Sequence, residues 1–162
     1  MLEAGEFEVA ISRLALCLGE AGPENLDDEH QRWELYRKAM QTGTCREELL
    51  KAVSLDPDVV LGTGVALHML EIEDPNSRQD WIGILRDDHQ REYAFRRARE
   101  VEILEAFGNI SGLSGDVVET WSDWLQIRLA EVSNVTEVLE LLAKFGRTKR
   151  IRRIASARHK VR

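Results

Sequence analysis

Residues 44–73 of this chain have the sequence TCREELLKAVSLDPDVVLGTGVALHMLEIE, and this stretch decides the class of fold. Apolar residues recur every three or four positions on both sides of Asp56, Pro57 and Asp58, the spacing that places side chains on one face of an α-helix. Aspartate accepts hydrogen bonds at a helix N-terminus, and proline suits the first helical position. The stretch therefore predicts two α-helices joined at this Asp-Pro-Asp turn.

The same helical spacing extends through the rest of the chain, and no stretch has the two-residue alternation of a β-strand. We expect about nine helices, near residues 7–18, 26–40, 44–53, 56–73, 74–85, 88–107, 117–132, 134–145 and from 148 onward. Thr44 and Asn134, each with a glutamate three residues later, predict capped helix starts, and Thr148 is the expected cap of the last helix. The loosest segment is the glycine-containing stretch 108–115.

Short connections between helices predict that sequential helices are antiparallel neighbours. We therefore predict an all-α fold of about nine short antiparallel helices stacked as an α-solenoid-like array, with a closed helical bundle as the alternative. A length of 162 residues fits one domain of ordinary size. The predicted organisation is a single all-helical domain over residues 1–162, in which 144–162 form a basic C-terminal helix.

Two local stretches resemble repeats of known α-solenoids. One is the spacing of Tyr36, Cys45, Leu49, Ala52 and Pro57 together with AVSLDPD at 52–58, which is similar to one tetratricopeptide repeat. The DPDVV stretch at 56–60 and residues 153–155 are each similar to part of a HEAT repeat. The resemblance implies hairpins that each bury a face on the next.

Charge is distributed unevenly along the chain. The whole sequence has 22 Lys and Arg residues against 29 Asp and Glu residues, a net charge of −7. Residues 144–162 contain nine of these bases and no acid, so residues 1–143 keep 13 bases and all 29 acids. An acidic body with a basic end suggests a charged partner or internal docking of the tail.

Composition excludes several classes of protein. A hydrophobic content of 43% is too high for a disordered chain, and two cysteines are too few for a disulfide scaffold. The uncharged stretch 59–70 is 12 residues long, shorter than the roughly 20 that span a bilayer. Because Glu6 and Glu8 interrupt the N-terminal segment, we expect no signal peptide. We expect a cytoplasmic protein with no membrane partner.

No catalytic motif is present, so we expect no enzymatic activity, no cofactor and no metal. Asp27, His30 and Glu34 have a spacing that metal ligation would use, but they suit a solvated acidic first turn of a helix. His68, beside Met69 and Leu70, is expected to be a hydrogen-bonded core or boundary residue.

The two cysteines and a central arginine cluster also have structural interpretations. Cys17 is expected to be a small core residue, and Cys45 lies at a predicted helix N-terminus, where a thiol pKa falls. Arg96, Arg97 and Arg99 are expected to belong to a surface ladder of ion pairs, with Glu92, Arg96 and Glu100 four residues apart.

Candidate partner-binding residues lie in the C-terminal third. Trp121 and Trp124 are three residues apart and share one helix face, where they serve either core packing or a partner, with Trp124 expected to be exposed. The last helix has a thin apolar edge of Ile151, Ile154 and Ala155. Its candidate binding residues are Lys149, Arg150, Arg152, Arg153 and Arg158.

Four interpretations of the basic helix stay open at this point: a solenoid cap lying on acidic neighbours, a site for an acidic protein, a contact for nucleic-acid phosphates, and membrane binding, which the absence of Trp and Phe disfavours. The hypothesis that we adopt is a non-enzymatic protein–protein interaction module, of the immunity, antitoxin or adaptor type, whose acidic body attracts a cationic partner. The alternatives are a nucleic-acid-associated protein that uses the arginine-rich helix and a helical enzyme without a recognised motif.

Overall fold

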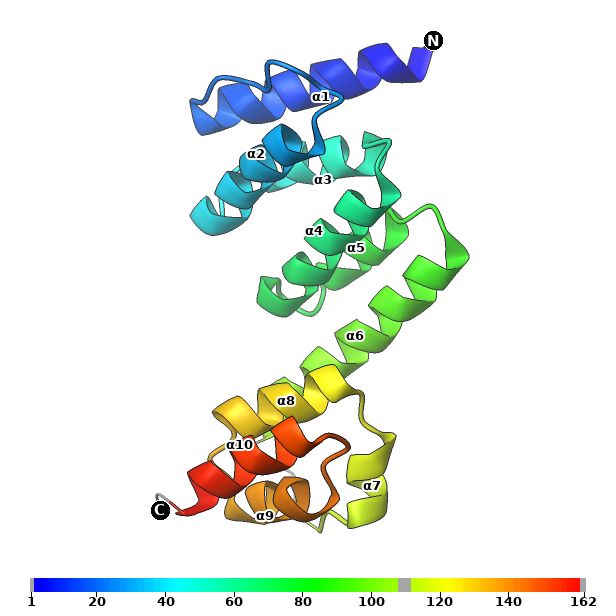
Figure 1. Ribbon diagram of the computed structural model, residues 1–162. Coiled ribbons are helices and arrows are strands. Elements are labelled where there is room, and N and C mark those ends of the chain that lie inside the picture. Colours follow the sequence, from blue (N-terminus) through cyan, green and yellow to red (C-terminus); the bar gives the residue numbers. More distant parts are fainter. Residues whose placement is uncertain (1, 108–111, 161–162) are drawn as a thin grey trace. The chain divides into compact units, whose positions relative to one another are not determined.

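The computed structural model describes residues 2–107 and 112–160, with side chains from residue 5 on, and these residues form ten α-helices and no β-strand (Figure 1). The all-α class is therefore confirmed. The helices are α1 (Leu2–Leu18), α2 (Glu29–Thr42), α3 (Arg46–Leu55), α4 (Val59–Ile72), α5 (Arg78–Gly83), α6 (Asp88–Ala106), α7 (Gly115–Thr120), α8 (Asp123–Val132), α9 (Thr136–Phe145) and α10 (Lys149–Lys160).

The chain divides into two compact units, Met1–Ala98 (unit 1) and Arg99–Arg162 (unit 2). Each unit has a hydrophobic core of its own. The single domain that we predicted from chain length is thus organised as two such units. Their charges differ: unit 1 contains 20 acids and 11 bases, whereas unit 2 contains nine acids and 11 bases.

In unit 1 the helices pack largely in chain order. Helix α1 lies on α2 and α3, this pair contacts α4, and α4 contacts α5. The core includes Ile11 and Leu14 of α1, Tyr36 of α2, Leu49 of α3 and Leu70 of α4, all of which are buried. This order of packing agrees with the stacked, solenoid-like arrangement expected from short connections.

Several helix ends lie where the sequence places them, but the capping predictions at Thr44 and Asn134 are wrong. Helix α9 has Val135 as its N-cap, and no side chain caps it. Gly43 ends α2 in the left-handed conformation, with φ of 66°. Helix α3, however, begins at Arg46 with Cys45 as its N-cap, and no side chain caps it. The Thr44 hydroxyl lies 3.0 Å from the Thr42 hydroxyl instead. The left-handed φ of 60° at Cys45 places Thr44 one residue outside the cap position.

The Asp-Pro-Asp turn also differs in detail from the expectation. Asp58 is the N-cap of α4 and accepts from the backbone N–H groups of Val60 and Leu61, at 2.9 and 3.0 Å. Pro57 therefore precedes the cap and is not the first helical residue. Asp56 is buried and makes tertiary contacts, described below.

Cys17 and Cys45 form a disulfide, with their Cα atoms 6.0 Å apart. The prediction that Cys17 is a core residue is wrong, since it is exposed at the end of α1. Packing of α1 on α3 brings together two cysteines that are 28 residues apart in sequence. Helical periodicity gives no information on such a contact.

In unit 2, helices α8, α9 and α10 pack on one another, and α7 packs on α9. The core includes Leu125 and Leu129 of α8, Leu139 and Leu142 of α9, and Ile151 of α10, all fully buried. Of the glycine-containing loop predicted at 108–115, positions 108–111 lie outside the described residues, and Gly115 is already the first residue of α7.

The helix predicted over 117–132 is in fact two helices, α7 and α8, which accounts for the tenth helix. Trp121 and Ser122 have extended backbone conformations, and the Ser122 hydroxyl caps α8 by accepting from the Leu125 N–H at 3.2 Å. The amide of the buried Gln126 donates to the carbonyl oxygens of Val118 and Trp121, at 2.9 and 3.1 Å. These carbonyl groups at the end of α7 are thereby satisfied without a continuous helix.

Candidate functional site

Helix α10 is fixed to unit 2 through its apolar edge. Ile151 and Ala155 are fully buried, and the helix packs on α8 and α9. The predicted cap is confirmed, because the Thr148 hydroxyl accepts from the Ile151 N–H at 3.2 Å. The basic helix begins at Lys149, so Lys144 belongs to the last turn of α9 and not to the C-terminal helix as predicted.

Two arginines and the buried amide of Gln126 hold the segment that leads into α10. Arg147 donates to the carbonyl oxygens of Glu119 and Trp121, at 3.1 and 2.8 Å, and forms an exposed ion pair with Asp123 at 3.1 Å. The Gln126 carbonyl oxygen accepts from the Arg147 backbone N–H at 2.9 Å. Arg152 donates to the carbonyl oxygen of Gly146. The start of α10 is thus held by hydrogen bonds as well as by apolar packing.

The side of α10 that points away from its apolar edge is cationic. Lys149, Arg150, Arg153 and Lys160 are exposed there, and we call these four residues the cationic face. Within the described part of the chain, none of the four forms a hydrogen bond or an ion pair through its side chain. From Lys149 to Lys160 the helix rises by about 17 Å at 1.5 Å per residue. A rigid helix therefore presents a row of positive charges to solvent.

One of the four interpretations was that α10 caps the fold and lies on acidic neighbours, and the helix does pack on α8 and α9. Among the described residues, α10 pairs with an acid through His159, whose Nε2 atom lies 3.6 Å from the Glu140 Oε1 atom. Apolar side chains hold the helix in place, while Arg152 and Arg158 are half-buried beside the cationic face. Cations near the C-terminal end of the helix also complement its dipole.

The two tryptophans contribute little surface. Trp121 is buried, and its ring packs edge-on against Phe107 with centroids 6.0 Å apart. Trp124, which we expected to be exposed, is half-buried against the core of unit 2, and the Arg128 guanidinium lies 6.0 Å from its ring centroid. The break between α7 and α8 places both side chains differently from a continuous helix. The candidate surface therefore consists of α10 residues.

Asp27, His30 and Glu34 do not come together as a possible metal site, although their spacing would have allowed it. Asp27 lies in the loop before α2, because Asp28 is the N-cap. His30 is exposed, and Glu34 pairs with Arg37 one turn along the helix. In the described ranges, no group of three or more His, Cys, Asp and Glu side chains is placed to hold a metal ion.

Two other expectations about charged residues are wrong. His68 is exposed on α4, because Met69 and Leu70 occupy the buried side of the helix. Arg97 is buried and donates to Glu71 at 3.3 Å and to the Tyr93 hydroxyl at 3.2 Å. The expected surface ladder is absent from the described residues, because Glu100 is buried and accepts from the Ser122 N–H at 3.3 Å.

A buried polar network in unit 1 escaped the sequence analysis. The Asp56 carboxylate accepts from the Arg32 guanidinium at 3.0 and 3.3 Å and from the Tyr36 hydroxyl at 2.7 Å. It also accepts from the Asp58 N–H at 2.8 Å. Burial and the adjacent carboxylate raise the pKa of Tyr36, so its hydroxyl stays protonated. The residues come from α2 and from the turn after α3. The only signal in the sequence was a charged residue, Asp56, next to Pro57 in that turn, and it did not indicate that Asp56 is buried.

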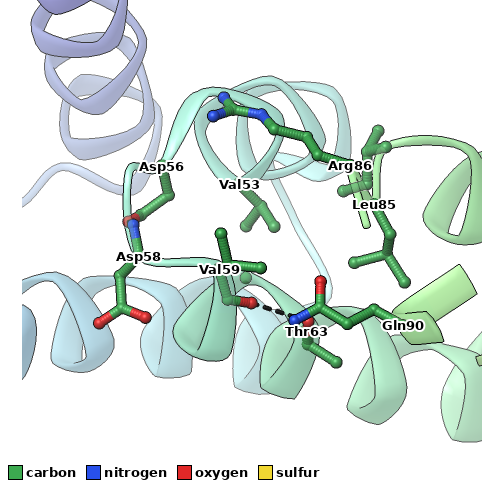
Figure 2. A pocket seen from close by; sticks show the side chains of 10 residues that line it. Val53, Asp56, Asp58, Val59, Thr63, Leu85, Arg86 and Gln90 are labelled. Carbon is green, nitrogen blue, oxygen red and sulfur yellow. Dashed lines mark hydrogen bonds between the residues drawn. The ribbon is translucent and has the colours of Figure 1, made fainter. Parts of the chain in front are cut away.

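A small pocket adjoins this network between α4 and the start of α6 (Figure 2). Val53, Val59 and Leu85 surround its centre, and the Gln90 amide reaches toward Thr63. Its volume of about 20 Å³ is room for about one water molecule. The Gln90 Oε1 atom is buried without a hydrogen-bond partner. The pocket is therefore of water size and does not accommodate a substrate.

Comparison of the chain with protein-family models, with curated proteins and with solved structures gives no match. The likeness to tetratricopeptide and HEAT repeats therefore stays a prediction. Within the described residues, no helix combines the length and the apolar character needed to cross a membrane.

Proposed function

We propose that this protein is a non-enzymatic interaction module whose cationic face binds an acidic region of another protein. The observation that carries the proposal is the exposure of Lys149, Arg150 and Arg153 on a helix held by its opposite edge. None of these three side chains forms a hydrogen bond with a described residue, so their N–H groups are available to a partner. Guanidinium groups form two parallel hydrogen bonds with a carboxylate, so arginines suit recognition of acidic side chains.

The charge around the cationic face favours an acidic protein over nucleic acid. Residues 99–143 of unit 2 carry nine acids and two bases, and the whole chain has a net charge of −7. A long polyanion would experience repulsion from these acids near the face, since electrostatic interactions extend about 8–10 Å in physiological salt. A compact acidic patch would contact the row of cations alone. Nucleic-acid binding remains the alternative outcome of the test below.

A direct binding measurement tests this proposal. The full chain is titrated into a fluorescent glutamate-rich peptide and, separately, into a short labelled DNA duplex, and anisotropy is recorded. We expect the peptide to bind, and its affinity to fall as salt is raised from about 50 to about 200 mM. Arg150→Ala/Arg153→Ala should weaken binding about fivefold to tenfold, as expected for two exposed ion pairs.

The matched control is Arg96→Ala/Arg99→Ala, which removes the same charge from exposed residues of α6. This variant should bind the peptide like the unaltered chain. Equal weakening by both double variants would show that net charge, not the cationic face, determines binding. Tighter binding of the duplex than of the peptide, lost in the α10 variant, would establish the nucleic-acid alternative.

A further inference from the structure

A groove of about 750 Å³ opens on unit 1, where α1, the loop before α2 and the end of α3 meet. Its apolar lining comes from Phe7, Leu26, Leu55 and Pro57. The groove is within the size range of about 300–1,000 Å³ typical of ligand sites in proteins. All of its lining residues belong to unit 1, whereas α10 belongs to unit 2.

The buried network of Arg32 and Asp56 makes the base of the groove rigid. Arg32 donates to the Leu26 carbonyl oxygen at 2.5 Å, and its guanidinium lies 6.0 Å from the Phe7 ring centroid. Asp56, which Arg32 also holds, lies between the lining residues Leu55 and Pro57. The buried Arg32 therefore holds three parts of the lining: Phe7, Leu26, and the segment 55–57 through Asp56. Because these lining residues are already held in place, binding of a ligand does not have to order them. The entropic cost of binding is therefore smaller, which favours affinity.

The rim of the groove is acidic. Glu8 and Asp27 line it, and both are exposed, with carboxylates that form no hydrogen bond or ion pair with a described side chain. The one cation in the lining, Arg86, donates to the Ser54 carbonyl oxygen at 2.7 Å. Unit 1 as a whole has 20 acids against 11 bases. The charged side chains of the lining therefore sum to −1, in a unit that is itself acidic.

We propose that this groove binds a basic segment of a partner protein, with an apolar side chain of the segment on Phe7 and Leu55 and lysine or arginine side chains against Glu8 and Asp27. The apolar floor supplies affinity through burial of surface. The acidic rim selects cationic segments and accelerates their encounter with unit 1. The inference is independent of the proposed function, because the surface lies in the other unit and has the opposite charge.

Three labelled peptides of equal length separate the contribution of the apolar floor from that of the acidic rim. Each is titrated with the full chain, and anisotropy is recorded. One contains leucines among lysines, the second has glutamates in place of the lysines, and the third has glycines in place of the leucines. We expect the leucine–lysine peptide to bind at least about tenfold more tightly than the other two. Nuclear magnetic resonance should show shifts at residues 5–8, 26–27 and 54–57 on binding.

Asp27→Lys should weaken binding of the leucine–lysine peptide about tenfold, since it places a like charge at the rim. Glu92→Lys is the matched control: it makes the same change of charge at an exposed residue of unit 1 outside the groove and should have little effect. Circular dichroism should show that both variants are folded. Absence of binding, equal effects of the two variants, or shifts confined to other residues would each overturn the proposal. Arg150→Ala/Arg153→Ala should leave this binding intact, which separates it from the function proposed for α10.

Discussion

At the scale of single residues, the charge of Asp56 is the feature on which unit 1 depends most. Its side chain is fully buried, as is nearly all of the Arg32 side chain, and every contact is charge-assisted or donated by a hydroxyl or backbone group. Such a pair contributes little net stability compared with apolar packing, but loss of one member leaves a buried charge without its counterpart. The network thus constrains which substitutions unit 1 tolerates.

Asp56→Asn tests this dependence. We expect a loss of about 3–5 kcal/mol in the free energy of unfolding, because the Arg32 charge stays buried without a carboxylate. The measurement is urea denaturation followed by circular dichroism. Glu34→Gln, which breaks the exposed pair with Arg37, is the control and should leave the unfolding midpoint nearly unchanged. A similar small effect of Asp56→Asn would contradict a structural role for the network.

The caps Asp28 and Asp58 should make the stability of unit 1 depend on acid pH. Hydrogen bonds from the backbone N–H of Gln31 lower the pKa of Asp28 below 3.8, and the N–H of Leu61 does the same for the pKa of Asp58. A lowered pKa in the folded state stabilises the fold above the unfolded value of about 3.9, and this stability is lost as the pH falls through the folded pKa.

Carboxyl titration by nuclear magnetic resonance should therefore give a pKa below 3.8 for both caps. Asp58→Asn keeps a capping side chain but removes the titrating group. We expect the stability of this variant to change less between about pH 4 and pH 2 than that of the unaltered chain. An identical pH profile would show that Asp58 is not responsible.

At the scale of elements, two glycines show how packing determines whether a helix terminus or a helix interior tolerates an added side chain. A Cβ atom on Gly146, between α9 and α10, would overlap the Leu142 carbonyl oxygen and lie 2.8 Å from the Ile151 side chain. Gly64, inside α4, has no heavy atom within 4 Å of the corresponding position. The same substitution should thus have opposite effects at the two sites.

Gly146→Ala is expected to destabilise unit 2 by about 1–3 kcal/mol, because the added methyl group must displace backbone or Ile151. Gly64→Ala should stabilise unit 1 by about 0.5–1 kcal/mol, since alanine has the higher helix propensity and space is open. Thermal unfolding of both variants gives the comparison. Destabilisation of the same size at both positions would show that loss of glycine, not contact with α10, is the cause.

At the scale of the whole molecule, two cores and one disulfide determine how stability is distributed. The bond between Cys17 and Cys45 lies within unit 1 and ties the end of α1 to the start of α3. Two cysteines are too few for a disulfide scaffold, but here they form one covalent link that the sequence analysis did not predict. The two cysteines are 28 residues apart in sequence. Because the disulfide restricts the unfolded chain, closing a loop of this length stabilises the folded state by about 3–4 kcal/mol.

Reduction of the disulfide should consequently affect unit 1 selectively. Hydrogen exchange measured with and without a thiol reductant should show faster exchange in α1, α2 and α3 after reduction, with α8, α9 and α10 unchanged. Cys17→Ser/Cys45→Ser should reproduce the reduced state and show no response to reductant. Equal acceleration throughout the chain would contradict the assignment of the disulfide to a separately packed core.

The sequence by itself determined the all-α class, the approximate position of most helices, and the concentration of positive charge at the C-terminal end. The class and the helix positions depend on periodicity and on capping residues close in sequence, such as Gly43 and Thr148. The concentration of charge is a property of composition alone. Only the tertiary structure decided the pairing of the cysteines, the burial of Asp56 with Arg32, the break at Trp121 and the exposed cationic face of α10. Each of these depends on which segments distant in sequence come into contact, and the energy of such a contact is a property of both segments together.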